Sequence, residues 1–99
     1  MKKDYENIRL ALRKELPKLN AEFNVSTLEV FGSYVRNEQN SNSDLDVLVT
    51  FSKVPDLLQF IELENYLSDL LELKVDLVMR SALKPNIGKR IISEAKPVL

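Results

Sequence analysis

The hydrophobic positions of this chain recur with two different periods, and each period predicts a different kind of element. Between residues 5 and 23 an apolar residue returns every three or four positions, which predicts an amphipathic helix. Pro17 lies inside this pattern, so we expect a kink or a break after Leu16. The same spacing predicts a second helix that begins at residues 55–56 and a short last helix that ends near Pro97.

Three shorter segments are rich in β-forming residues and predict strands. Residues 27–31 form the first, and a loop without any apolar side chain, 37–43, leads to the second at 44–51. The third covers residues 74–79. The predicted order is helix, strand, strand, helix, strand, helix. This order indicates the α/β (α+β) class, with a small mixed β-sheet flanked by helices.

The second predicted strand carries two acids at its beginning. Period-two alternation places Asp44, Asp46 and Leu48 on one face and four apolar side chains on the other. Asp76 is a third acid, set among the apolar residues of the last predicted strand. Each acid taken alone also fits an ordinary structural role, as a solvated strand end or as an edge-strand charge that prevents aggregation.

The composition limits the chemistry in which these acids can take part. The 99 residues contain no Cys and no His, so any catalysis must use carboxylates, hydroxyls and cations. A chain of this length predicts one domain, residues 1–99, without a separate substrate domain. The formal net charge of −1 gives no overall field for gripping long nucleic acid. Because no apolar run approaches the length of a membrane span, we expect a cytoplasmic protein.

Two carboxylates at positions i and i+2 on one face suit a pair of hard divalent cations. Mg²⁺ takes a near-octahedral shell of carboxylate, water and phosphate oxygens, and Mn²⁺ accepts similar ligands. Two such ions ~3.5–4 Å apart can activate an attacking hydroxyl and neutralise a leaving pyrophosphate, and the first of them needs a third carboxylate. We therefore expect Asp44, Asp46 and Asp76 to be catalytic and to bind two Mg²⁺ ions.

A second group of residues is suited to phosphate. Gly32 lets the backbone approach a triphosphate closely, and Ser33, at the start of a short helix, offers a hydroxyl and amides to phosphate oxygens. The ordinary alternative for this pair is a turn whose serine caps the helix. Arg36 either faces the phosphates or the acids, or pairs with Glu38 at the surface. Ser43 either adds a phosphate hydrogen bond or closes a turn.

Taken together, the segments GSYVRNE at 32–38, SDLDVLV at 43–49 and VDLV at 75–78 resemble a known family. They are similar to the minimal nucleotidyltransferases of the DNA polymerase β-like superfamily, the MNT proteins encoded beside HEPN-domain toxins. The resemblance extends over nearly the whole chain and rests on the ordered set Gly-Ser, Asp-x-Asp and a distant third Asp. It departs from the family at Asn37, where Gly is common, although Asn also tolerates left-handed backbone angles.

The resemblance implies a polymerase β palm-like sheet in which Asp44 and Asp46 hold the metals and Asp76 completes the catalytic one. It also implies that Gly32-Ser33 binds the β- and γ-phosphates of ATP, and that AMP is moved to a tyrosine of a partner HEPN ribonuclease, for which the chain is the antitoxin. Two other functions stay open at this point. The chain can be a binding module that neutralises the toxin by covering it, or a nucleotidyltransferase for a small molecule or an RNA end.

Overall fold

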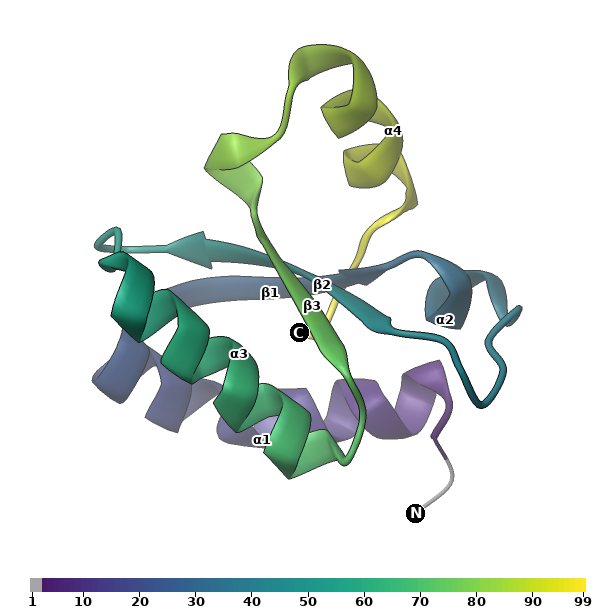
Figure 1. Cartoon of the computed structure of the whole chain (residues 1–99), viewed down its shortest axis with the longest axis horizontal. Coiled ribbons are helices and arrows are strands. Elements are labelled where there is room, and N and C mark those ends of the chain that lie inside the picture. The colour runs from purple at the N-terminus through teal and green to yellow at the C-terminus, as the bar shows by residue number, and fades with distance from the viewer. Residues whose placement is uncertain (1–2) are drawn as a thin grey trace.

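The computed structural model describes residues 3–99, which form a four-stranded mixed sheet with helices on both sides (Figure 1). The strands are β1 (Val25–Phe31), β2 (Leu45–Phe51), β3 (Val75–Met79) and the two-residue β4 (Lys96–Pro97), in the spatial order β3-β2-β1-β4. β1 is antiparallel to β2 and to β4, whereas β2 and β3 are parallel. The small mixed sheet flanked by helices that the sequence predicts is therefore confirmed.

Helices α1 (Tyr5–Phe23) and α3 (Leu57–Leu71) cover one face of the sheet, and α4 (Pro85–Glu94) lies on the opposite side (Figure 1). The one-turn helix α2 (Ser33–Arg36) follows β1, and the 3-10 turn η1 (Arg80–Ala82) follows β3. Among residues 3–99, no helix combines the length and the apolar character that crossing a membrane requires.

The hydrophobic core lies between the sheet and the layer formed by α1 and α3. Ile8, Leu12 and Leu19 of α1 and Leu63 and Leu67 of α3 are fully buried in one cluster with side chains of the strands. Full burial of one such side chain stabilises a fold by about 1.5–3 kcal/mol. This layer therefore holds the sheet in place, while the opposite face of the sheet is left for the site.

The alternation predicted along β2 is confirmed. Leu45, Val47 and Val49 belong to the core cluster. Leu48 is buried but lies outside this cluster, and the neighbouring Asp46 is half-buried. The face of β2 turned away from α1 and α3 therefore carries Asp46.

The predicted kink or break after Leu16 does not interrupt α1, which continues through Pro17 as one helix. A proline lacks the backbone donor and crowds the carbonyl four residues earlier. That carbonyl belongs to Arg13, an exposed residue, so water can satisfy it. Leu16 and Leu19 on either side of the proline are buried, and their packing against the sheet holds the helix together across this turn.

The last helix ends before the predicted position near Pro97. α4 stops at Glu94, and Lys96 and Pro97 pair with Val30 and Glu29 as β4. A strand of two residues leaves no recognisable period in a sequence. Proline is tolerated here because β4 is an edge strand, where a missing backbone donor breaks no ladder.

Candidate functional site

Gly32, directly after β1, has a backbone conformation that shapes the site. Its φ of 81° lies in the region that residues with a side chain rarely adopt. A Cβ built on Gly32 would lie 2.2 Å from Oδ2 of Asp46. The missing side chain therefore leaves the space that this carboxylate occupies.

Asp46 and Asp76 are neighbours across the parallel pair of β2 and β3. They are partners in the register of these strands, and partners in register project from the same face of a sheet. On the other side of β2, the register partner of Asp46 is Phe31, the residue before Gly32. The structure therefore brings Gly32, Asp46 and Asp76 together at one end of the sheet.

The pKa of Asp46 is raised from its ordinary value of 3.8 to about 6. Burial is the largest cause, followed by the negative charges of Asp76 and Asp44; Arg36 lowers this pKa, and Glu94 raises it further. A half-buried carboxyl among like charges favours either a proton or a nearby cation. Such a group is suited to cation binding or proton transfer.

Asp44, Asp46 and Asp76 form an acidic group. Asp44 lies at the edge of this acidic group, directly before β2. Its side chain is 43% exposed, and its Oδ2 is 3.8 Å from Nζ of Lys74. Tyr34 of α2 is buried, and its pKa is raised first by that burial and then by the charge of Asp44. Asp44 therefore interacts with groups of both α2 and the turn before β3.

A cleft of about 530 Å³ opens beside Asp44. It is lined mainly by the polar loop 39–44 and the turn 72–74. Ser43 and Asp44 are part of its wall, whereas Asp46 is not. The acidic group as a whole therefore lies on the open face of the sheet, at the border of this cleft and not inside it.

The chemistry of the three carboxylates suits a hard divalent cation. Carboxylate oxygens are the protein ligands that Mg²⁺ prefers. The raised pKa of Asp46 reflects first its burial and then the repulsion from Asp76 and Asp44, which a cation would relieve. Within residues 3–99, no three Asp, Glu, His or Cys side chains converge as a preformed metal site. Binding of metal here therefore requires the accessible side chains of Asp44 and Asp76 to turn toward Asp46.

Arg36 pairs with two glutamates. Its Nε is 3.0 Å from Oε2 of Glu38, and its Nη1 pairs with Oε1 of Glu94 at the end of α4. The pair with Glu38 is the surface alternative that the sequence left open for this arginine. Arg36 also lowers the pKa of Asp46, so its charge acts on the acidic group as well.

The other two residues expected to bind the nucleotide, Ser33 and Ser43, lie at the start of a short helix and in a turn. Ser33 begins α2, but a helix of four residues offers an anion the amides of one turn and little macrodipole. Asn37 ends this helix with a φ of 57°, the left-handed conformation expected for it. Oγ of Ser43 accepts a hydrogen bond of 2.9 Å from the backbone N–H of Asn40, so in this structure it closes a turn.

Two residues that pair with Arg36 or with the acidic group were not indicated by the sequence. Glu94 is distant along the chain and reaches Arg36 only because α4 folds back over the sheet. Lys74 could have been found from the parallel pairing of β2 and β3. It directly precedes Val75, the register partner of Leu45, just as Asp44 precedes Leu45.

Known proteins are similar in sequence to this chain over nearly its whole length. Residues 10–99 match the family described as nucleotidyltransferase domain. The protein adenylyltransferase MntA of Thermococcus cleftensis is 50% identical over 91 residues, which cover 92% of this chain and 89% of that protein. A Methanocaldococcus jannaschii protein, provisionally named as a protein adenylyltransferase, is 48% identical over 92 residues, which cover 93% and 94% of the two chains.

Solved structures share the fold. One described as a minimal nucleotidyltransferase has a TM-score of 0.79 and 36% identity, with 95% of each chain covered. A toxin–antitoxin structure with AMP-PNP has a TM-score of 0.71 and 26% identity, and the match covers 96% of this chain and 73% of that one. Sequence and fold lead to the same conclusion: this chain belongs to the nucleotidyltransferase domain family, as one of its minimal nucleotidyltransferases.

Proposed function

We propose that this chain, as a single domain over residues 1–99, moves AMP from ATP onto a HEPN-type toxin and is thereby its antitoxin. The observation that carries the proposal is the half-buried Asp46 behind Gly32 and in register with Asp76. The MntA relative is named for protein adenylyl transfer, and a neighbouring structure is a toxin–antitoxin complex with an ATP analogue. Both support ATP as the substrate and a toxin as the partner.

In the proposed reaction, an acceptor hydroxyl oxygen forms a bond to the α-phosphorus of ATP. The bond from this phosphorus to the α–β bridging oxygen breaks, and pyrophosphate leaves. The hydroxyl proton passes to Asp76, which is exposed on the open face and can release it to water. Asp44, Asp46 and Asp76 would hold two Mg²⁺ ions, which when bound neutralise charge on the phosphates and the leaving group.

A tyrosine of the toxin is the acceptor that we propose. A phenol has a pKa near 10, so it gives up its proton to a carboxylate more readily than an aliphatic hydroxyl does. The open face of the sheet end is accessible enough for a side chain presented by another protein, since Asp76 is exposed and Asp44 lies at a cleft border. The acceptor would therefore approach over Asp76.

Four residues form the proposed nucleotide-binding set. The Ser33 hydroxyl and the amides next to Gly32 would contact the β- and γ-phosphates. Arg36 would bind a phosphate with its guanidinium, which forms paired hydrogen bonds to phosphate as well as to carboxylate. Ser43, on the cleft wall, would exchange its turn hydrogen bond for one to the nucleotide.

The proposal is tested by co-expressing this chain with the product of its neighbouring gene and recording intact masses. We expect one or more AMP-sized additions on a partner tyrosine with the wild-type chain. Asp46→Asn should abolish them, whereas Glu22→Gln, which removes one exposed acid at the far end of α1, should not. In the purified system, a chelator should stop transfer, and added Mg²⁺ or Mn²⁺ should restore it.

Other results would redirect the interpretation. An unmodified partner in a stable complex would indicate neutralisation by occlusion. Neither complex nor modification would indicate a small molecule or an RNA end as the acceptor. Transfer that continues in excess chelator would contradict the metal assignment alone.

A further inference from the structure

The first turn of α3 exposes apolar side chains that are not part of the hydrophobic core. Buried residues of this helix, such as Leu63 and Leu67, face the sheet. Positions 57, 58 and 61 are neighbours on a different side of the helix, because residues three and four apart lie next to each other. With the residue at position 54 they form the α3 patch, whose members are 68%, 75%, 67% and 42% exposed in chain order: Val54, Leu57, Leu58 and Ile61.

The charged residues along the chain around the α3 patch are mainly acids, although Lys53 directly precedes Val54. From Val54 to Leu73 the chain has five acids and neither Lys nor Arg: Asp56, Glu62, Glu64, Asp69 and Glu72. Glu62 and Asp69 are exposed on α3 itself. Contiguous apolar side chains rimmed by polar residues mark interaction sites, and charge on the rim selects a partner of opposite charge. The α3 patch therefore fits a surface with an apolar centre and a rim of Lys and Arg.

A second copy of this chain fits poorly. In a two-fold symmetric contact the patch of one copy would meet the same mainly acidic rim on the other, and more like charges than unlike charges would face each other. We infer that the α3 patch is the docking surface for the HEPN-type toxin, which meets it with a basic-rimmed apolar surface. This inference rests on the proposed function.

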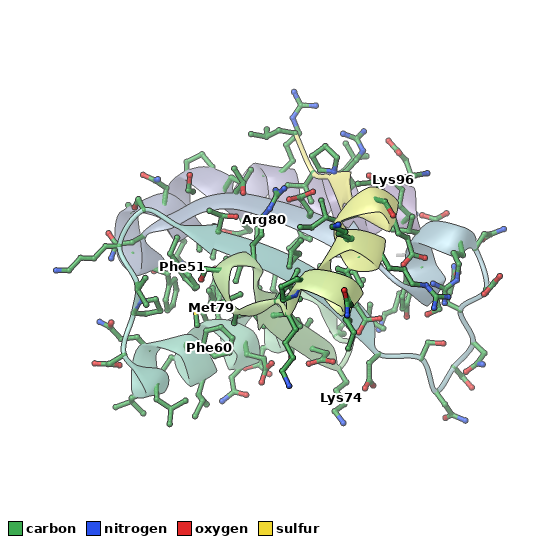
Figure 2. All side chains as sticks on the ribbon, turned by 90° about the horizontal axis from the view of Figure 1, so that it is seen from above. Phe51, Phe60, Lys74, Met79, Arg80 and Lys96 are labelled. Atoms are coloured by element: carbon green, nitrogen blue, oxygen red, sulfur yellow. The ribbon has the colours of Figure 1, made fainter. Side chains whose placement is uncertain are left out.

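The α3 patch lies away from the acidic group. β2 begins beside Asp44 and ends at Phe51, whose ring centroid is 6.3 Å from that of Phe60 in the first turn of α3. Figure 2 shows these two rings together, apart from Lys74, the residue directly before β3. A toxin held at this end leaves the open face free for ATP and the acceptor hydroxyl. Docking and transfer therefore use separate surfaces.

The inference is tested by titrating the purified chain with the HEPN-type protein of its own organism, using calorimetry. We expect Leu58→Ser to raise Kd at least ten-fold, because central apolar contacts dominate interface affinity. Leu10→Ser is the matched control, since Leu10 is an exposed leucine (49%) on α1 outside the patch. It should leave Kd unchanged, and both variants should bind ATP as the wild type does.

The acidic rim provides a second test that does not depend on an apolar substitution. The double variant Glu62→Gln/Asp69→Asn changes two exposed side chains, so it keeps the fold, and its Kd should respond less to salt than that of the wild type. This variant decides the question if Leu58→Ser fails to fold, which circular dichroism would show.

Three outcomes would overturn the inference. Equal affinities for the wild type, Leu58→Ser and the rim variant would remove the docking surface and leave the proposed function intact. A wild-type chain that does not bind the HEPN-type protein would overturn the proposed function, and the docking surface with it. A chain that is dimeric alone and becomes monomeric as Leu58→Ser in light scattering would assign the patch to a second copy.

Discussion

At the scale of single residues, Gly32 meets two requirements that no other residue type meets together. Its φ of 81° and ψ of −153° suit only glycine, and a Cβ would lie 2.2 Å from a carboxylate oxygen of Asp46. We therefore expect Gly32→Ala to lower the free energy of unfolding by at least about 2 kcal/mol, because backbone strain and displacement of Asp46 add. Urea unfolding measures this loss, and nucleotidyl transfer should fall with it.

Gly88, the other glycine of the chain, is the matched control for this prediction. It lies inside α4, and a Cβ there would meet Cβ of Leu83 at 3.0 Å, a side-chain contact that can shift. The gain in helix propensity from alanine, up to about 1 kcal/mol, offsets this contact. A Gly32→Ala variant as stable as Gly88→Ala would contradict the role given to Gly32.

At the scale of elements, the pair between Arg36 and Glu94 ties α2 to α4 across the open face. The Glu94 side chain is 23% exposed, whereas Glu38, the other partner of Arg36, is 64% exposed and only two positions away. In double-mutant cycles with Arg36→Gln, we expect a larger coupling energy for Glu94→Gln than for Glu38→Gln, because the Glu94 side chain is better shielded from solvent. Chemical unfolding of the three single variants, the two double variants and the wild type provides these values.

This prediction also has a consequence for the proposed chemistry. If the pair positions Arg36 for the nucleotide, Glu94→Gln should raise the KM for ATP and leave kcat nearly unchanged. Equal coupling for Glu38 and Glu94 would show that the link between α2 and α4 contributes nothing specific.

The elements of this fold differ in how far they can be predicted from sequence. Alternation in 44–51 places Asp46 opposite the core without knowledge of the fold, because one face of β2 is buried. The start of α3 is equally local, since Asp56 and Gln59 form a capping box. That Asp46 lies in register with Asp76 depends on strand pairing, which no local pattern encodes.

Long-range contacts explain the features that were not predicted. β4 consists of two residues whose pairing with β1 depends on the return of the chain after α4. Glu94 and Arg36 meet for the same reason. Pro17 shows the opposite effect, because a local signal for a break is overridden by the burial of Leu16 and Leu19 against the sheet.

At the scale of the whole molecule, the burial of Asp46 and the like charges around it make the stability of the fold depend on pH. Its folded-state pKa of about 6 lies above the ordinary 3.8, so the folded state holds an extra proton between these values and stability falls as pH rises from about 4 to about 6. Asp46→Asn removes the charge. At pH 7.5 its free energy of unfolding should exceed that of the wild type by about 1–2 kcal/mol, after allowance for partial solvent screening, and at pH 4 the two should be equal. For a domain of this size this difference equals roughly 4–16 °C in Tm, measurable by circular dichroism.

Mg²⁺ at pH 7.5 should raise the Tm of the wild type more than that of Asp46→Asn, because the cation relieves the repulsion between Asp46 and the like charges around it. Asp69→Asn, an exposed acid on α3, should show neither effect, and a gain for Asp46→Asn that is equal at both pH values would contradict the electrostatic explanation.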